Sequence, residues 1–175
     1  MIHYLNRKDL NSIFDIIYKN FTLKEKVPDY AEDKTAVDNL GGVLERIKMD
    51  DFYPDFYDKV TYLIIQINKG HFFQNGNKRL ALVSVLSFIF LNGYDVSSQD
   101  KEIYRKKIQE LFSNFKDFQD YEDFFPEEFA YYNLSVIIAD SNEYTSSFEE
   151  LKTRVKEFFV FSLVKKNRRF VFVRR

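Results

Sequence analysis

One strongly apolar, uncharged stretch stands out along the chain. No residue from Leu80 to Tyr94 carries a charge, although charged residues make up 30% of the sequence. A helix over this stretch is apolar on nearly every face, as is typical of a helix buried at the centre of a fold. The stretch is shorter than the roughly 20 residues that a membrane-spanning helix needs. The pattern therefore predicts a buried central helix over residues 77–92, ended by Gly93.

Amphipathic segments precede this central helix and make the predicted fold class mainly α. Their apolar side chains recur at helical spacing, and the expected helices cover residues 9–21, 36–48 and 57–69. Gly41 and Gly42 lie inside the second helix, where we expect them to mark close packing against a neighbour. Gly70 is expected to end the third helix.

The remainder of the chain predicts two more helices. Ser97 or Ser98 can cap a helix that runs to about Phe112. Ser147 opens a Ser-x-x-Glu capping-box pattern, which predicts a helix through about Phe159.

The C-terminal third is polarised in charge and ends in two short apolar runs. Residues 114–150 are rich in Asp and Glu, whereas the chain from Lys152 onward is rich in Lys and Arg. The runs at 160–164 and 170–173 are expected to form two strands of a terminal β-hairpin. A lone hairpin is only marginally stable, so we expect this tail to fold back on the helices, partly neutralised by the acidic segment.

Composition points to one globular protein of the cytoplasm. The chain has 175 residues, of which 45% are hydrophobic, so it is long enough for a sizeable core. A net charge of −1 gives no general attraction to nucleic acid, although phenylalanines among the C-terminal cations leave RNA contact as an alternative. The chain has no cysteine, which excludes disulfides, and its N-terminus has no apolar signal core. We expect no membrane partner. The expected division is a helical core over 1–112 and a C-terminal extension over 113–175 that packs on it.

A polar, cationic loop lies immediately before the central helix. Residues 71–79 read HFFQNGNKR. Free backbone N–H groups and the positive end of the helix dipole make a helix N-terminus attractive to anions. Lys78 and Arg79 add full positive charges, and Gly76 lets the backbone approach a phosphate closely. His71 lies at the edge of this predicted anion site and is a candidate general base.

The run from His71 to Arg79 resembles the motif of the Fic/Doc family, which is usually written H-P-F-x-(D/E)-G-N-(G/K)-R. Lys78 stands where most Fic enzymes have glycine, and Leu82 stands where they have a second arginine. Both residues are more similar to the Doc (death-on-curing) branch. The resemblance covers about residues 4–112 and implies the Fic helical fold.

The resemblance implies a transferase that uses ATP and Mg²⁺. In the family the histidine, here His71, removes the proton from an attacking Ser, Thr or Tyr hydroxyl of a target protein. Asn75 stands where the family has the carboxylate that holds the magnesium, so it is the candidate, weak metal ligand. The nucleotide-binding positions of the family match Gly76, Asn77, Lys78 and Arg79.

Within the family, Lys78 implies a kinase that phosphorylates its target, usually a translation factor, and acts as the toxin of a toxin–antitoxin pair. The resemblance also implies a flap that aligns the target, within residues 48–56. Two alternatives remain. One is transfer of AMP to a protein; the other is a catalytically weak binding protein, because the amide of Asn75 lacks the charge of a carboxylate.

Overall fold

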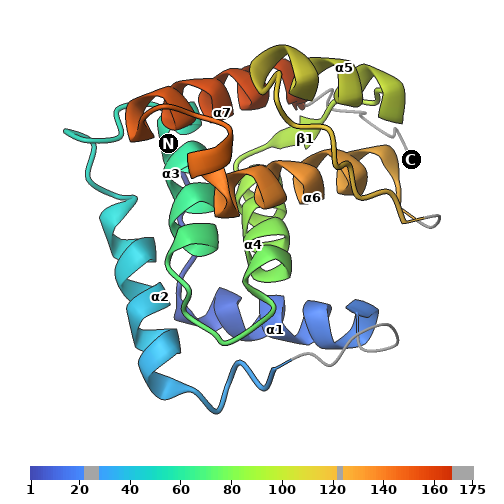
Figure 1. The fold of residues 1–175 in the computed structure, drawn as a ribbon. Coiled ribbons are helices and arrows are strands. Elements are labelled where there is room, and N and C mark those ends of the chain that lie inside the picture. The colour runs from blue at the N-terminus through green and yellow to red at the C-terminus, as the bar shows by residue number, and fades with distance from the viewer. Residues whose placement is uncertain (22–27, 122–123, 167–175) are drawn as a thin grey trace, which may run out of the picture.

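The computed structural model of the chain describes residues 1–21, 28–121 and 124–166. The described part is mainly helical, with two short strands, as the sequence predicts (Figure 1). In chain order the elements are α1 (Arg7–Phe21), α2 (Lys34–Arg46), α3 (Phe56–Lys69), α4 (Asn77–Leu91), β1 (Tyr94–Val96), α5 (Lys101–Leu111), α6 (Pro126–Ala139), the 3-10 helix η1 (Ser141–Glu143), α7 (Phe148–Ser162) and β2 (Leu163–Lys165).

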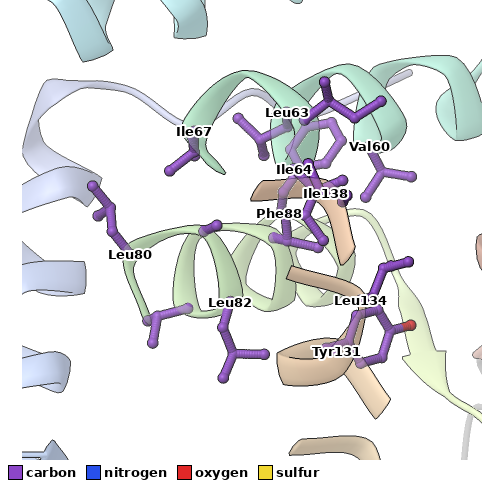
Figure 2. Close-up of a cluster of buried hydrophobic side chains, with 14 of the residues drawn as sticks. Val60, Leu63, Ile64, Ile67, Leu80, Leu82, Phe88, Tyr131, Leu134 and Ile138 are labelled. Carbon is purple, nitrogen blue, oxygen red and sulfur yellow. The ribbon is translucent and has the colours of Figure 1, made fainter. Parts of the chain in front are cut away.

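Helix α4 is the buried central helix. It packs against α1, α3 and α6, so it has a neighbour on nearly every side. Gly93 follows the end of α4 and adopts a left-handed φ of 74°, which suits a glycine at a helix stop. Figure 2 shows how the side chains of α4 interdigitate with those of α3 and α6. The labelled residues are Leu80, Leu82 and Phe88 of α4, Val60, Leu63, Ile64 and Ile67 of α3, and Tyr131, Leu134 and Ile138 of α6. The predicted central helix is confirmed.

Helices α1, α2 and α3 form within a few residues of the predicted positions. Asp55 caps α3, since its carboxylate accepts a hydrogen bond of 2.8 Å from the backbone N–H of Asp58. The close packing expected at Gly41 and Gly42 is wrong, because a Cβ added to either would meet no atom within 4 Å. The apolar side chains of α2 pack on the core, whereas these two glycines lie away from it.

Helix α5 begins later than predicted. Ser97 does not cap it, because the Ser97 backbone N–H donates to the carbonyl of Ser162 at 2.8 Å, and the helix starts at Lys101. The segment between β1 and α5 is therefore held by the end of α7.

Helix α6 has no counterpart among the predicted helices. It lies inside the acidic segment, yet its own sequence is mostly apolar and most of its side chains are buried. Pro126 stands in its first turn, and the Glu128 carboxylate accepts a hydrogen bond of 2.9 Å from the Phe125 backbone N–H. These two helix-start signals are present in the sequence, but the acidic character of the longer segment obscured them.

The capping residue of α7 is predicted correctly, whereas the following strand is predicted to begin too early. The Ser147 hydroxyl accepts a hydrogen bond of 3.1 Å from the backbone N–H of Glu150. The helix then continues through Ser162, so residues 160–162 are helical and not the start of a strand. Strand β2 pairs antiparallel with β1, which lies far away in the sequence. The other predicted strand, 170–173, lies outside the described residues.

The described part of the C-terminal third packs on the helical core. Phe158 and Phe159 of α7 are fully buried, and both rings lie beside Tyr131 of α6. The Lys156 ammonium group lies 2.6 Å from the Asp58 carboxylate and 3.0 Å from that of Asp55. This cation is therefore paired with the start of α3 and not with the acidic segment. No helix in the described ranges has the length and apolar character needed to cross a membrane.

Candidate active site

The end of α3, the loop after it, the start of α4 and one face of α6 enclose a cavity of about 310 Å³. All six residues that the sequence singled out contribute to its lining. Two further lining residues lie on α6, and one lies in the last turn of α3. The lining residues are Asn68, His71, Asn75, Gly76, Asn77, Lys78, Arg79, Tyr132 and Ala139.

Gly76 sets the shape of the loop at the N-terminus of α4. Its φ of 77° is left-handed, and its carbonyl accepts a hydrogen bond of 3.0 Å from the Tyr30 hydroxyl. A Cβ at this position would lie only 2.3 Å from that hydroxyl oxygen, so a glycine is required. Since no side chain caps α4 at Gly76, the backbone N–H groups of the first turn are available to an anion.

The side chain of Asn77 braces the loop. Its Oδ1 accepts from the Phe73 backbone N–H at 3.1 Å, and its Nδ2 donates to the Phe73 carbonyl at 2.6 Å. The Phe73 ring is buried edge-on against Tyr30, with ring centroids 4.8 Å apart. These bonds use Oδ1 and one N–H of the amide, which leaves its second N–H and the backbone N–H as the donors of Asn77 for an anion.

His71 lies at the cavity in a backbone conformation that is rare for a residue other than glycine. Its φ is 44°, and such left-handed conformations cost about 1–3 kcal/mol each. The preceding Gly70 ends α3, and a Cβ there would lie 2.4 Å from the Phe72 ring. This tight turn presents an exposed histidine beside the start of α4. A base in this position can accept a proton from a group that enters the cavity.

The charge of the lining is positive. Lys78 and Arg79 are its permanently charged side chains, and no Asp or Glu is among the lining residues. The side chain of Asn75 is exposed and offers one amide oxygen, whereas Mg²⁺ prefers carboxylates among several oxygen ligands. Within the described residues, no three His, Cys, Asp or Glu side chains gather as a metal site would need. The lining therefore fits an anion and does not by itself make a metal site.

Sequence reasoning missed the contribution of α6. Burial raises the pKa of the Tyr132 hydroxyl, as do the hydrogen bond and charge of Tyr121, whereas the charge of Arg79 lowers it. Tyr132 and Arg79 both line the cavity. The two residues are far apart in the chain, and the signals that could have placed Tyr132 on a helix are those at Pro126 and Glu128.

The loop expected to carry the flap lies elsewhere on the surface and contributes no side chain to the cavity lining. Asp50 is paired with the buried ammonium group of Lys59 at 2.7 Å, and the Tyr53 ring packs on Tyr62 with centroids 4.3 Å apart. These contacts hold the loop on α3. Its role as a flap stays a prediction.

The chain is similar to known proteins over a region that includes residues 71–79. Residues 4–89 match the family model described as Fic/DOC family. Residues 4–89 therefore form a Fic/Doc-family region, and the curated match supports its Doc-like branch. Over 98 residues it is 28% identical to a curated protein, Toxin Doc of Mycolicibacterium smegmatis (strain ATCC 700084 / mc(2)155). That match covers 56% of this chain and 71% of the toxin. No solved structure matches the chain.

Proposed function

We propose that the chain is a Doc-like toxin that transfers the γ-phosphoryl group of ATP to a hydroxyl group of a target protein. The observation that carries this proposal is that His71 and the cationic N-terminus of α4 line the same cavity. A proton acceptor and an anion site must adjoin if a hydroxyl is to attack a bound phosphate. The similarity to Toxin Doc supports the toxin role.

In the proposed reaction, His71 takes the proton of a Ser, Thr or Tyr hydroxyl as that oxygen attacks the γ-phosphorus. The bond from the γ-phosphorus to the bridging oxygen of the β-phosphate breaks, and ADP leaves with that oxygen. Lys78, Arg79 and the first backbone N–H groups of α4 stabilise the negative charge on the transferred phosphoryl oxygens. Asn77 keeps the loop in place during this step through its two bonds to Phe73.

Mg²⁺ enters the proposal as an ion that ATP brings with it. Its ligands would be mainly phosphate oxygens, with Asn75 as the candidate ligand from the protein, because the cavity lining has no carboxylate. When bound, the ion neutralises phosphate charge.

Expression in a bacterium tests the proposal. Wild-type chain should slow growth and add the mass of a phosphoryl group to a host protein, whereas His71→Ala should do neither. Co-expression of the antitoxin protein that the toxin role implies should restore growth. If His71→Ala slows growth and modifies the same protein as wild type does, His71 is not the base and the proposed mechanism is wrong.

A second candidate function is that of a binding protein without transferase activity, and the observation that favours it is the amide at Asn75. It predicts nucleotide binding without any modified protein. The remaining alternative is AMP transfer. It adds the mass of AMP to the target protein, whereas phosphorylation adds only the mass of a phosphoryl group.

A further inference from the structure

A second cavity, of about 240 Å³, lies between the loop that joins α2 to α3, one face of α3 and the first turns of α7. This loop and the start of α7 both lie beside α3 in Figure 1. The motif residues 71–79 do not line this second cavity. Helix α7 also lies outside residues 4–89, the part of the chain that matches the family model. We call this second cavity the α3–α7 groove.

The inner part of the α3–α7 groove is aromatic and uncharged. Ile65 of α3 is buried, and the rings of Tyr53 and Tyr62 lie with their centroids 4.3 Å apart. Burial, together with the neighbouring Tyr62, raises the pKa of the Tyr53 hydroxyl to about 12. Both phenols therefore stay neutral at physiological pH, and this part of the groove suits an apolar group.

Two exposed phenylalanines flank the groove. Phe52, from the loop, is 64% exposed, and Phe148, from the start of α7, is 50% exposed. Folding of the chain thus leaves two large apolar side chains in water on either side of one hollow. Exposed apolar side chains that gather at a hollow mark binding surfaces, and phenylalanine is enriched where proteins meet.

The volume of the groove indicates how large a group it accepts. A cavity of about 150 Å³ accommodates benzene, whereas most sites for small molecules and cofactors are larger than about 300 Å³. The α3–α7 groove lies between these values, at about 240 Å³. It therefore has room for one aromatic or long aliphatic side chain, which is how a partner protein commonly anchors itself.

The charges of the groove are only partly neutralised. The Lys152 ammonium group lies 3.6 Å from the Glu149 carboxylate. The Lys156 ammonium group is shared between two carboxylates, that of Asp58 at 2.6 Å and that of Asp55 at 3.0 Å. Because one cation faces two carboxylates, this end of the groove keeps a negative charge.

Asp51 adds a further carboxylate, exposed and adjacent to Phe52 in the chain. Carboxylates therefore outnumber cations along the edge of the groove. Such an edge repels the phosphates of nucleic acids and of anionic lipids, and it attracts Lys and Arg side chains. The charge thus favours a basic protein segment over these other ligands.

We propose that the α3–α7 groove binds a segment of a partner protein that inserts one aromatic or long aliphatic side chain between Phe52 and Phe148 and carries Lys or Arg beside it. This inference goes beyond the proposed function and does not depend on it, because none of the residues assigned to phosphoryl transfer lines the groove.

Fluorescence polarisation of the full chain with a labelled synthetic peptide tests this inference. In the peptide, Phe and Leu side chains are flanked by Lys, and a second peptide has Glu at each Lys position. The Lys peptide should bind the wild-type chain with an affinity that falls as salt is added, and the Glu peptide should not bind. Phe148→Ser should weaken binding of the Lys peptide at least about tenfold, as expected for an anchoring aromatic side chain.

Phe125→Ser is the matched control, because Phe125 is also an exposed phenylalanine at the start of a helix but does not line the groove. This variant should bind the Lys peptide as tightly as wild type does. Phe52→Ser is a second, independent variant and should weaken binding as Phe148→Ser does. Since both side chains are exposed, their replacement leaves the buried core in place.

The outcomes separate the proposed partner from other occupants of the groove. Absence of binding by the Lys peptide, equal binding of the two peptides, or unchanged affinity in Phe148→Ser and Phe52→Ser would each overturn the inference. Sedimentation of the chain alone tests a second copy as the occupant. A wild-type dimer that Phe148→Ser converts to a monomer would overturn the inference in favour of self-association. Binding of RNA or of anionic lipid vesicles that is lost in Phe148→Ser would also overturn it.

Discussion

Arg79 carries one of the two permanent positive charges in the cavity lining. Its replacement by alanine should weaken ATP binding by more than about 1.5 kcal/mol, the lower range for a hydrogen bond to a charged group. Calorimetry measures this difference directly. Lys106→Ala removes an exposed cation outside the cavity and should leave the affinity unchanged. Equal ATP affinity of wild type and Arg79→Ala would contradict the placement of the phosphates.

Asn75 gives the cavity an amide where the family has a carboxylate. Asn75→Asp should therefore raise the dependence of nucleotide affinity and transfer rate on Mg²⁺. The measurement is a magnesium titration at fixed ATP. Gln74→Asp adds the same charge one residue earlier, outside the cavity lining, and should have no such effect. A gain in both variants, or in neither, would mean that position 75 does not approach the metal.

The motif residues could be found in the sequence because they are contiguous. Residues 71–79 form one loop and one helix start, so neighbours in the chain are also neighbours in the cavity. Tyr132 comes from a helix more than fifty positions later. Its place in the cavity depends on how α6 packs on α4, which local patterns do not encode.

At the scale of elements, the loop before α4 depends on the left-handed conformation of Gly76. Gly76→Ala should lower the free energy of unfolding by about 1–3 kcal/mol, because the added Cβ is strained at this φ and meets the Tyr30 hydroxyl. Gly42→Ala in α2 is the opposite case, since a Cβ there has open space in a helix. It should raise the free energy of unfolding by about 0.5–1 kcal/mol. Urea unfolding of both variants measures the two changes. A Gly76→Ala protein as stable as wild type would mean that the loop does not need this conformation.

The helices that the sequence predicted best are those with a clear apolar stripe or an uninterrupted apolar run. Helix α4 has an uninterrupted apolar run, and its predicted bounds differ from the observed ones by one residue. Helix α6 is almost as apolar, but the acidic residues around it dominated the interpretation of that segment. The partner of β2 is β1, and this pairing joins positions about seventy residues apart. Local alternation predicts a strand but does not identify such a distant partner.

At the scale of the whole molecule, the end of α7 and β2 fix the C-terminal third to the core. Truncation after Phe159 removes the hydrogen bond between Ser162 and Tyr131 and the buried side chain of Leu163. We expect a loss of about 2–4 kcal/mol in the free energy of unfolding, and more exposed apolar surface. A chain that ends at Lys166 keeps these contacts and is the matched control. If both truncated chains are equally stable, the docking of this segment does not contribute to the free energy of unfolding. Binding of RNA by the full chain with a steep salt dependence would then favour an interaction arm.

Charge pairing accompanies this docking and agrees with the expectation in part, because Lys152 and Arg154 pair with Glu149 and Glu150 at the end of the acidic segment. Lys156 pairs with the carboxylates at the start of α3, and Lys166 pairs with Asp95 at 3.3 Å. Exposed ion pairs contribute about 0–1 kcal/mol each, so the buried phenylalanines of α7 contribute more to the docking. The charge polarity of the sequence therefore predicted the local pairs at the start of α7, but not the pairs between distant segments.

We propose that the cavity at the N-terminus of α4 transfers a phosphoryl group with His71 as the base. ATP labelled either at the γ-phosphate or at the α-phosphate, incubated with bacterial proteins and the full chain, tests it most directly. We expect that the γ label, and not the α label, becomes attached to a protein, and that His71→Ala abolishes the transfer. Attachment of the α label would mean AMP transfer, and attachment of neither label would mean a binding protein. Either result would overturn the proposed phosphoryl transfer.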